Sequence, residues 1–451
     1  MRRNFCICAL FSASSITCVL AQSLFFDEKA LRSETSCRLH IEGDVDGGKE
    51  VSRSWVFQYT SRIRYTHMAM IAALDNGTFF VAWQAASRTE GSSEQDIQYS
   101  VGNLNFAGAL QFGEPKRAPV GSGEGAVWGP VLHVDHHNAY LWLFYSESRG
   151  SCKGSVMEWA PGGDIMALQM DLMSGAWSKA RAIYSLQEDR GIPKVTANQA
   201  LVLSTGEWIL PFWRERALLS FSPACRELDG DTSAGVLISY DEGFTWEAHG
   251  EITHPESWLI ENAVSEMPNG EVVMVFRTEV GFVYVSRSHD KGRTWVPAVA
   301  ISQLPNPNSK VDLAWVTSDD RGALAVVFND HQEARRDLRV ALSWDAGRTW
   351  TRVATIEAGE EGVHLHYPTM VQYGCYLVVV YSRFYARTRH WAREHSKEQG
   401  IRIAAIDLRH LSPQPSYFDH SALQDPEQQE ELQQIRNQAD AFLQLATFGQ
   451  H

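Results

Sequence analysis

One eight-residue turn occurs three times in this chain and constrains its fold more than any other feature. The copies share the pattern S-x-D-x-G-x-T-W and occupy residues 239–246, 288–295 and 343–350. In such a turn the Asp side chain can accept hydrogen bonds from nearby backbone N–H groups, and the Gly takes a positive φ that a Cβ would disfavour. The Thr and Trp begin the returning strand. Because each copy follows an apolar strand, we interpret the repeats as structural turns of a β-protein and not as an active site.

A longer unit recurs around these turns. It consists of an apolar strand, a tight turn and a second apolar strand, and its six turns contain Asn76-Gly77, His137-Asn138, Thr205-Gly206, Asn269-Gly270, Arg321-Gly322 and Tyr373-Gly374. A third strand follows each unit, and the spacing of roughly 50 to 65 residues is typical of propeller blades. Six such four-stranded antiparallel sheets around an axis form an all-β, six-bladed β-propeller, which leaves only short protected edges. A solenoid or two sandwiches would not explain the same unit six times.

The ends of the chain differ from the repeats. Residues 1–21 are expected to be a signal peptide, because two arginines precede an uncharged apolar run that ends in small residues. Residues 22–54 form a lead-in segment, the propeller is expected over 55–410, and residues 411–451 are expected to hold a linker and an amphipathic C-terminal helix. The protein is therefore expected to be secreted or lumenal in the secretory pathway. No membrane span is expected after cleavage, although an uncleaved anchor is the alternative.

Charge and cysteine content narrow the function classes. The net charge of −14 argues against nucleic-acid binding, which needs a basic face. Four cysteines lie beyond the leader, an even number that suits an oxidising compartment. Cys152 and Cys225 fall in corresponding loops of adjacent blades and are the preferred disulfide, while four buried thiols are the alternative. Asn76 begins the one glycosylation sequon and is expected in an exposed turn.

The order of strands in each blade sorts residues between the two faces of the propeller. The Asp turns lie on one face, whereas the starts of the innermost strands and the loops after the second strands lie on the other. Polar residues collect on this second face. They include, at the strand starts, His67, Glu261, Asn308, Asp312 and Tyr367, and, in or near the loops, Glu90, Asp96, Arg214 with Glu215, Arg277 and Arg335. This face is therefore the predicted place of a functional site.

The repeated Asp turn on a six-blade pattern resembles the sialidase superfamily over the whole expected propeller. Two stretches carry the resemblance more specifically. Residues 261–277, which begin with ENAVSEMPNG and end in Arg277, look like the family segment with a catalytic Glu and a carboxylate-binding Arg. Residues 335–338, RRDL, look like the R-x-(N/D)-L segment that brings another Arg, and Tyr367 follows where the family has its Tyr. Residues 306–309 and 88–96 look more like a bacterial-type subgroup of undefined substrate.

The resemblance implies a set of roles. Tyr367 would be the nucleophile and Glu261 its base, while Arg277 and Arg335 would bind the carboxylate of an anionic sugar. A neutral Tyr suits such a sugar, because a carboxylate nucleophile would be repelled by it. Glu90 or Asp96 would be the acid/base. The further substrate-binding residues would be His67, Asn308 and Asp312, and His67 stands where the family has its first Arg.

Three functions remain open at this point. The first is a secreted sialidase-like hydrolase that removes an anionic terminal sugar. The second is a polysaccharide lyase acting on uronate-containing glycans, with His67, Tyr367 and Arg277 as its working residues. The third is a non-catalytic glycan-binding propeller. No metal-ligand spacing and no cofactor fingerprint stands out, so the expected partner is an anionic glycan alone.

Overall fold

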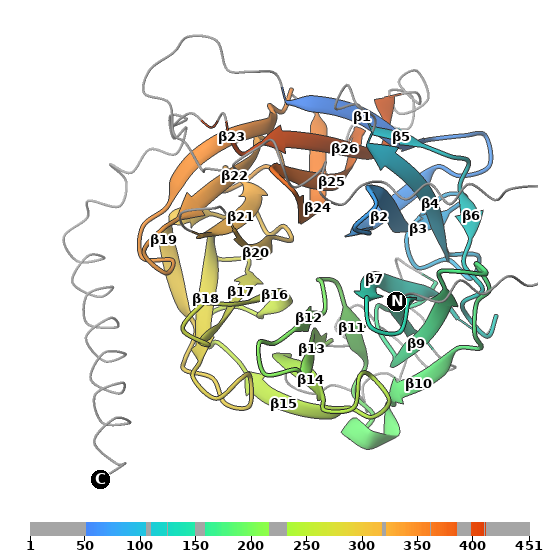
Figure 1. Ribbon diagram of the computed structural model, residues 1–451, viewed down its shortest axis with the longest axis horizontal. Coiled ribbons are helices and arrows are strands. Elements are labelled where there is room, and N and C mark those ends of the chain that lie inside the picture. Colours follow the sequence, from blue (N-terminus) through green and yellow to red (C-terminus); the bar gives the residue numbers. More distant parts are fainter. Residues whose placement is uncertain are drawn as a thin grey trace, which may run out of the picture. The chain divides into compact units, whose positions relative to one another are not determined.

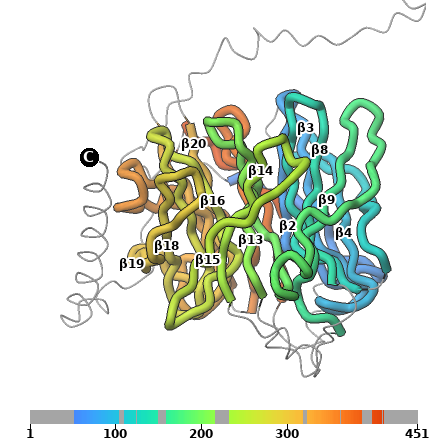
Figure 2. The backbone as a smooth tube through the Cα atoms, turned by 90° about the horizontal axis from the view of Figure 1, so that it is seen from below, coloured from blue at the N-terminus to red at the C-terminus, as the bar shows by residue number. Residues whose placement is uncertain are grey.

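The computed structural model describes residues 51–104, 110–123, 125–148, 158–215, 232–317, 322–360, 362–385, 398–409 and 411. These residues form a six-bladed β-propeller of antiparallel sheets, as the sequence predicts (Figure 1). Figure 2 shows from the side that strands of neighbouring blades run between the two faces of the ring. In these ranges no helix is long and apolar enough to cross a membrane.

The first three blades follow one another along the chain. Blade 1 contains β2 (Tyr65–Ala73), β3 (Thr78–Ala86), β4 (Asp96–Leu104) and β5 (Leu110–Phe112), with β6 (Lys116–Arg117) also paired to β4. Blade 2 contains β7 (Val127–Asp135), β8 (Tyr140–Glu147), β9 (Asp164–Asp171) and β10 (Arg181–Tyr184). The short 3-10 helix η1 (Gln187–Asp189) leads to blade 3, which contains β11 (Lys194–Thr196), β12 (Leu201–Val202), β13 (Trp208–Arg214), β14 (Ser233–Ser239) and β15 (Glu247–Ile252).

The other three blades complete the ring. Blade 4 contains β16 (Ile260–Glu266), β17 (Val272–Arg277), β18 (Phe282–Ser288) and β19 (Val299–Pro305). Blade 5 contains β20 (Asp312–Val316), β21 (Ala323–Asn329), β22 (Leu338–Ser343) and β23 (Thr351–Glu357). Blade 6 contains β24 (Val363–Tyr373), β25 (Tyr376–Tyr385), β26 (Gly400–Asp407) and β1 (Ser52–Gln58).

Blade 6 is built from both ends of the propeller sequence. Strand β1 pairs antiparallel with β26, and Ser52 lies opposite Ala405 (Figure 1). The first strand therefore supplies the outermost strand of the last blade, a pairing that the sequence analysis does not predict. This strand begins at Ser52, ahead of the expected propeller start at residue 55.

The three Asp turns have the hydrogen bonds that their sequence predicts. In the second copy, Asp290 Oδ1 accepts the Thr294 N–H at 2.8 Å and its Oδ2 accepts the Thr294 hydroxyl at 2.6 Å. Gly292 has a φ of 90°, and its carbonyl accepts the indole N–H of Trp295 at 2.9 Å. The three turns lie in blades 3, 4 and 5, on the face opposite the predicted site.

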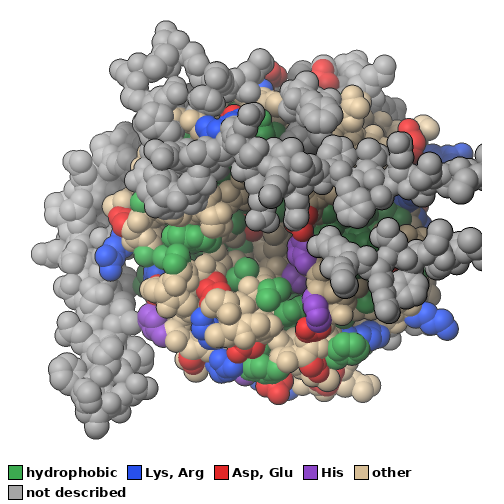
Figure 3. Space-filling view, in the orientation of Figure 1, with side chains coloured by type: hydrophobic (Ala, Val, Ile, Leu, Met, Phe, Trp, Pro, Cys, Tyr) green, Lys and Arg blue, Asp and Glu red, His purple; other side chains and the backbone are tan. Residues whose placement is uncertain are grey.

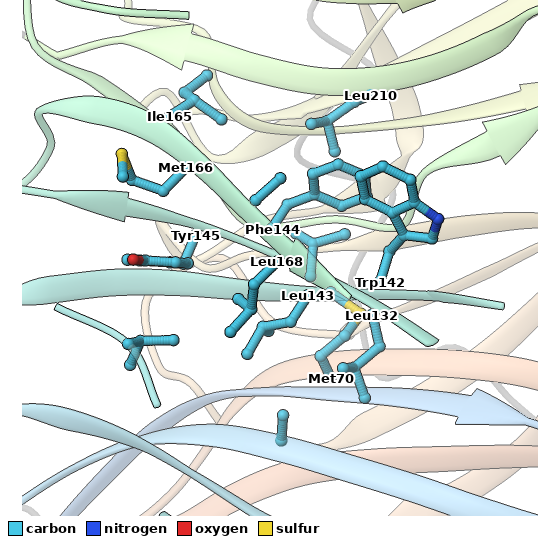
Figure 4. Packing of buried hydrophobic residues seen from close by; sticks show 14 of the residues in the cluster. Met70, Leu132, Trp142, Leu143, Phe144, Tyr145, Ile165, Met166, Leu168 and Leu210 are labelled. Carbon is cyan, nitrogen blue, oxygen red and sulfur yellow. The ribbon is translucent and has the colours of Figure 1, made fainter. Parts of the chain in front are cut away.

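The hydrophobic core lies between adjacent blades. Met70 of β2, Leu132 of β7 and Leu210 of β13 belong to one buried cluster, together with Trp142 and Phe144, whose stacked rings lie 5.5 Å apart (Figure 4). Both faces of most strands are covered, so these strands are almost continuously apolar, as expected for sheets packed on two sides.

On the described surface seen in Figure 3, acidic and basic side chains are interspersed.

Four innermost strands carry the same irregularity near their starts. The pairing register shifts after His67, Trp128, Ile260 and His366. The next residue in each strand has a left-handed backbone, with φ of 52° at Met68, 53° at Gly129, 51° at Glu261 and 52° at Tyr367. A bulge of this kind changes the direction of a side chain, and non-glycine residues with positive φ concentrate at functional sites. We call these features the left-handed bulges.

Several expected features lie outside the described residues. These are the signal peptide, the lead-in segment before residue 51, the C-terminal helix, and both Cys152 and Cys225. Cys375 is a buried free thiol. Asn76 lies in the exposed turn between β2 and β3, where its Oδ1 accepts the Thr78 N–H at 3.0 Å, and its glycosylation stays a prediction.

Candidate active site

A tyrosine, a glutamate and an arginine from blades 4 and 6 meet at the starts of the innermost strands. Tyr367 Oη donates a hydrogen bond to Glu261 Oε1 at 2.5 Å. Arg277 Nη1 donates to the same Glu261 oxygen at 2.7 Å and to Tyr367 Oη at 2.6 Å. Two of the left-handed bulges carry this pair, since Glu261 and Tyr367 are themselves the residues with positive φ. With their neighbours they form the central cluster, which we define as Glu261, Arg277, Tyr367, His67, Asn308, Arg335 and His366.

Arg277 ends β17 and is oriented by two blades. Its Nε donates to Asn308 Oδ1 at 2.7 Å, and Nη1 is used by Tyr367 and Glu261. Among the described residues its Nη2 has no hydrogen-bond partner. Burial alone would lower the pKa of Arg277, but the Glu261 carboxylate and Tyr367 raise it above its usual value. The guanidinium therefore stays charged and can still accept an anionic ligand.

Tyr367 is held in its neutral form. Burial raises the pKa of its hydroxyl, and this effect exceeds the opposing effect of the Arg277 charge. An acceptor must therefore remove the proton before the oxygen can act as a nucleophile. Glu261 Oε1 is placed for that transfer, and Glu261 Oε2 is buried with no hydrogen-bond partner in the described part of the chain.

Arg335 approaches Tyr367 from blade 5. Its Nη1 contacts His366 Nδ1 at 2.8 Å, and its Nη2 donates to the Asn308 carbonyl. The Arg335 and Arg277 guanidinium carbons each lie 5.9 Å from the centre of the Tyr367 ring. Within the described ranges Arg335 has no acidic partner, so it is the cation of the cluster most available to an anion.

His67 occupies the place where the resemblance to sialidases implies an arginine. Its ring centre lies 3.9 Å from that of Tyr367, and its Nδ1 is buried without a hydrogen-bond partner among the described residues. Burial, and then the charges of Arg335 and Arg277, lower the pKa of His67 well below its usual value. The side chain at the place that the resemblance assigns to the family's first Arg is therefore a neutral imidazole.

Two further carboxyl groups face the cluster. Glu90, in the loop between β3 and β4, has a raised pKa because of burial, and the charge of Glu261 raises it further. Glu215 follows β13, and its Oε2 accepts the Trp213 indole N–H at 2.6 Å. Burial raises the pKa of Glu215 to about 7, with a smaller contribution from the charge of Glu261. Glu215 can thus carry a proton near neutral pH, and the pKa of Glu90 is shifted in the same direction.

Glu215 is a candidate that the sequence does not single out. The sequence places it on the correct face, next to Arg214, but nothing there separates it from a solvated loop residue. The structure separates the two neighbours: Arg214 makes a buried ion pair with Asp189 at 2.7 Å, whereas Glu215 binds Trp213. Trp213 packs in one apolar cluster with Tyr367, which connects Glu215 to the site.

Two expected site residues have other partners. Asp96 makes an ion pair with Arg117 Nε at 3.0 Å and accepts a hydrogen bond from Gln98. Asp312 accepts the backbone N–H groups of Met370 at 2.8 Å and of Leu313 at 3.0 Å. Glu90 is therefore the better placed of the two acid/base candidates, and the described contacts of Asp312 are structural. The other expected residues that lie together in the central cluster are Glu261, Arg277, Tyr367, His67, Asn308 and Arg335. In the described part of the chain, no group of three or more His, Cys, Asp or Glu side chains could hold a metal ion.

The fold is that of a sialidase-like β-propeller. The family model of the BNR repeat-like domain matches residues 77–379, and the chain belongs to this family. No curated protein is similar enough in sequence to count as a relative.

Solved structures share the fold at low sequence identity. A Hadza microbial sialidase is 16% identical, with a TM-score of 0.57, and the match covers 77% of this chain and 66% of that one. The Trypanosoma rangeli sialidase in complex with the inhibitor DANA is 14% identical, with a TM-score of 0.56 and coverage of 76% and 55%. A Dyadobacter fermentans protein of unknown function is 15% identical, with a TM-score of 0.60 and coverage of 81% and 100%. The match thus spans less than two thirds of both sialidase chains, and these likenesses concern the fold.

Proposed function

We propose that this protein is a secreted sialidase-like glycoside hydrolase that removes a terminal sugar bearing a carboxylate. The observation that carries the proposal is the contact of Tyr367 Oη with both Glu261 Oε1 and Arg277 Nη1. A neutral phenol beside a carboxylate acceptor and a guanidinium is suited to attack a carbon that lies next to a negative charge.

The proposed reaction has two displacements. Tyr367 Oη attacks the anomeric carbon while its proton passes to Glu261 Oε1, and the bond from that carbon to the leaving oxygen breaks. The leaving oxygen takes a proton from Glu90. Water then attacks the same carbon and gives a proton to Glu90, the bond to Tyr367 breaks, and Tyr367 recovers its proton from Glu261. Two inversions give net retention of configuration.

The substrate carboxylate has two cationic partners in this proposal. Arg335 has no acidic partner within the described residues, and Arg277 keeps Nη2 for a ligand although Glu261 offsets its charge. Charge-assisted bonds from guanidinium groups suit a carboxylate. The neutral His67 can offer a hydrogen bond but no charge. The cluster therefore supports a sialic-acid-like ligand bound by two arginines and not by three.

One observation favours a second candidate, a lyase acting on uronate-containing glycans. The neutral His67 ring lies 3.9 Å from Tyr367, beside two arginines that could offset the uronate charge. In such a reaction His67 would take the proton from the carbon next to the carboxylate, Tyr367 would protonate the leaving oxygen, and a carbon–carbon double bond would form. That product absorbs in the ultraviolet, which separates it from a hydrolysis product.

A glycan panel with the purified protein tests these functions. The panel contains glycans with terminal sialic acids, with other terminal keto sugar acids and with internal uronates. Release of a free sugar acid without ultraviolet absorbance supports the hydrolase, and a new absorbing product supports the lyase. Binding of panel glycans without turnover of any of them contradicts both the hydrolase and the lyase. The protein would then be a non-catalytic glycan-binding propeller. A fluorinated sialosyl fluoride, which slows release of a covalent intermediate, should label the peptide that contains Tyr367.

A further inference from the structure

Two fully buried side chains contact the backbone at the left-handed bulges of the central cluster. Asn198 Nδ2, from blade 3, donates to the carbonyl of Glu261 at 2.8 Å. Lys310 Nζ, from blade 5, donates to the carbonyl of Pro368 at 2.6 Å and to Thr369 Oγ1 at 2.9 Å. Pro368 directly follows Tyr367, so each bulge residue is held by a blade other than its own.

The Lys310 contact is more than packing, because a buried ammonium group is costly unless it is paired and hydrogen-bonded. Burial lowers the pKa of Lys310 to about 8, while the charges of Asp312 and Glu261 oppose that effect. Asp312 in turn accepts the Met370 N–H at 2.8 Å. Lys310 and Asp312 therefore hold three consecutive residues of β24, immediately after Tyr367.

Holding these bulges matters because neither Glu261 nor Tyr367 is a glycine. A left-handed backbone at such residues persists only when surrounding contacts enforce it. If either bulge relaxed to an ordinary strand, its side chain would turn to another direction and the contact between Tyr367 Oη and Glu261 Oε1 would be lost.

We propose that Lys310 and Asn198 are positioning residues, which hold the backbone at Tyr367 and Glu261 so that the phenol meets its proton acceptor. The loss of kcat that this role predicts rests on the proposed hydrolase function. The change in backbone geometry that it predicts does not, because the geometry of the cluster can be measured without any substrate.

The chain offers a matched control at the left-handed bulge of blade 2, which a residue of blade 3 contacts. Thr196 Oγ1 donates to the carbonyl of Gly129 at 2.8 Å, which is the same kind of bond between blades at another left-handed bulge. That bulge carries neither member of the Tyr367–Glu261 pair. Thr196→Val removes the hydrogen bond with little change in shape, so it measures the cost to folding alone.

The kinetic experiment compares Lys310→Met, Asn198→Leu and Thr196→Val by Tm and by kcat and KM on the best substrate of the glycan panel. We expect kcat to fall about 100-fold in the first two variants, the effect of misplacing a reacting group by about 1 Å, with KM little changed. Thr196→Val should lower Tm and keep kcat. Lys310→Gln, whose amide group can still donate hydrogen bonds, should recover part of the loss. If kcat falls in proportion to the loss of Tm in all variants, Thr196→Val included, the positioning role is wrong.

A crystal structure of Lys310→Met, or of Asn198→Leu if the first does not fold, gives the independent measurement. We expect the φ of the affected bulge residue to leave the left-handed region and the hydrogen bond between Tyr367 and Glu261 to break. An unchanged cluster in a folded variant overturns the proposal. If the wild-type protein turns over no substrate, the proposed function fails, and this structural result still decides the positioning role.

Discussion

Tyr367 and Glu261 are separated by 106 residues in the chain, yet the Tyr367 hydroxyl donates to Glu261 Oε1 at 2.5 Å. Each lies at a left-handed bulge, one in β24 and the other in β16. The two bulges turn the side chains toward each other across the innermost strands of blades 4 and 6. The chemistry proposed for this protein depends on that relationship.

Removing either partner should abolish turnover. We expect Tyr367→Phe to reduce kcat by at least about 1,000-fold, because the nucleophilic oxygen is lost, and Glu261→Gln by about 100- to 10,000-fold, because the proton acceptor is lost. The double variant should be little worse than Tyr367→Phe, since residues that act as a unit are not additive. Steady-state kinetics checks these values.

A second buried tyrosine–glutamate pair serves as the control for those variants. Tyr381 Oη donates to Glu357 Oε2 at 2.5 Å, away from the central cluster. Tyr381→Phe should lower stability by about 1 to 3 kcal/mol, because one hydrogen bond to a charged group is lost while Glu357 Oε2 keeps its bond from Arg402, and should keep kcat. Equal losses of kcat in Tyr367→Phe and Tyr381→Phe would point to a folding defect and not to catalysis.

The pH dependence of activity should distinguish the two candidate proton donors. Glu90 and Glu215 both have raised pKa values, and that of Glu215 is about 7. A donor must be protonated, so kcat/KM should fall as pH rises through the pKa of the true donor. We expect Glu90→Gln to remove this alkaline limb and to affect a poor leaving group far more than an activated aryl group. Should Glu215→Gln behave in this way instead, Glu215 is the donor.

Glu215 should also make stability depend on pH. Its pKa is raised from 4.5 to about 7, so the folded state binds more protons than the unfolded state between these values. The stabilisation from its protonated form is complete below pH 4.5 and is lost as pH rises through 7. Relative to Glu215→Gln, the wild type should lose up to a few kcal/mol across this window, at about 1.4 kcal/mol per pKa unit. Urea unfolding at a series of pH values measures the difference, and parallel curves would contradict it.

Arg335 should contribute to binding of the anionic group. We expect Arg335→Met to raise KM by roughly 10- to 100-fold for a carboxylate sugar, which matches about 1.5 to 3 kcal/mol for hydrogen bonds to a charged group. For the methyl ester of the same sugar, the effect on KM should be much smaller. Isothermal titration with the product sugar acid gives the same comparison without catalysis. An equal loss for acid and ester would exclude Arg335 as the carboxylate ligand.

Glu357 should be a strong determinant of stability. Its carboxylate accepts from Arg383 Nε and Arg402 Nη1, both at 2.7 Å, as well as from Tyr381, and it links blade 5 to blade 6. Glu357→Gln should cost about 3 kcal/mol, because the buried Arg383 and the partly buried Arg402 lose the carboxylate nearest to them. The exposed pair of Arg190 and Glu251 gives the control, and Glu251→Gln should cost at most about 1 kcal/mol. Thermal unfolding ranks the two variants.

The sequence predicts the blades well because each blade is mostly local. Strand, turn and returning strand lie within one stretch of sequence, and the Asp turns mark where strands reverse. The face of the site follows from the same geometry, and the resemblance to sialidases singles out Glu261, Arg277, Arg335 and Tyr367 on that face. Their individual contacts come from different blades, and the sequence does not specify them.

What the sequence could not predict depends on contacts between blades. The left-handed bulges are an example, because Glu261 and Tyr367 have no local signal for a positive φ. Asp312 looks like a site residue at a strand start, but it is used by the backbone of the neighbouring blade. Glu215 looks like a loop residue, but burial next to Trp213 raises its pKa to about 7.

The pairing of β1 with β26 has a consequence during biosynthesis. Residues 52–58 leave the ribosome long before residues 400–407, so the first described strand must wait for the strand with which it pairs. Blade 6, which carries Tyr367, gains its outermost strand only after residues 400–407 have been made. A nascent chain that is released early therefore lacks the assembled pair of Tyr367 and Glu261, and we expect the proposed hydrolase to be inactive until its ring is complete.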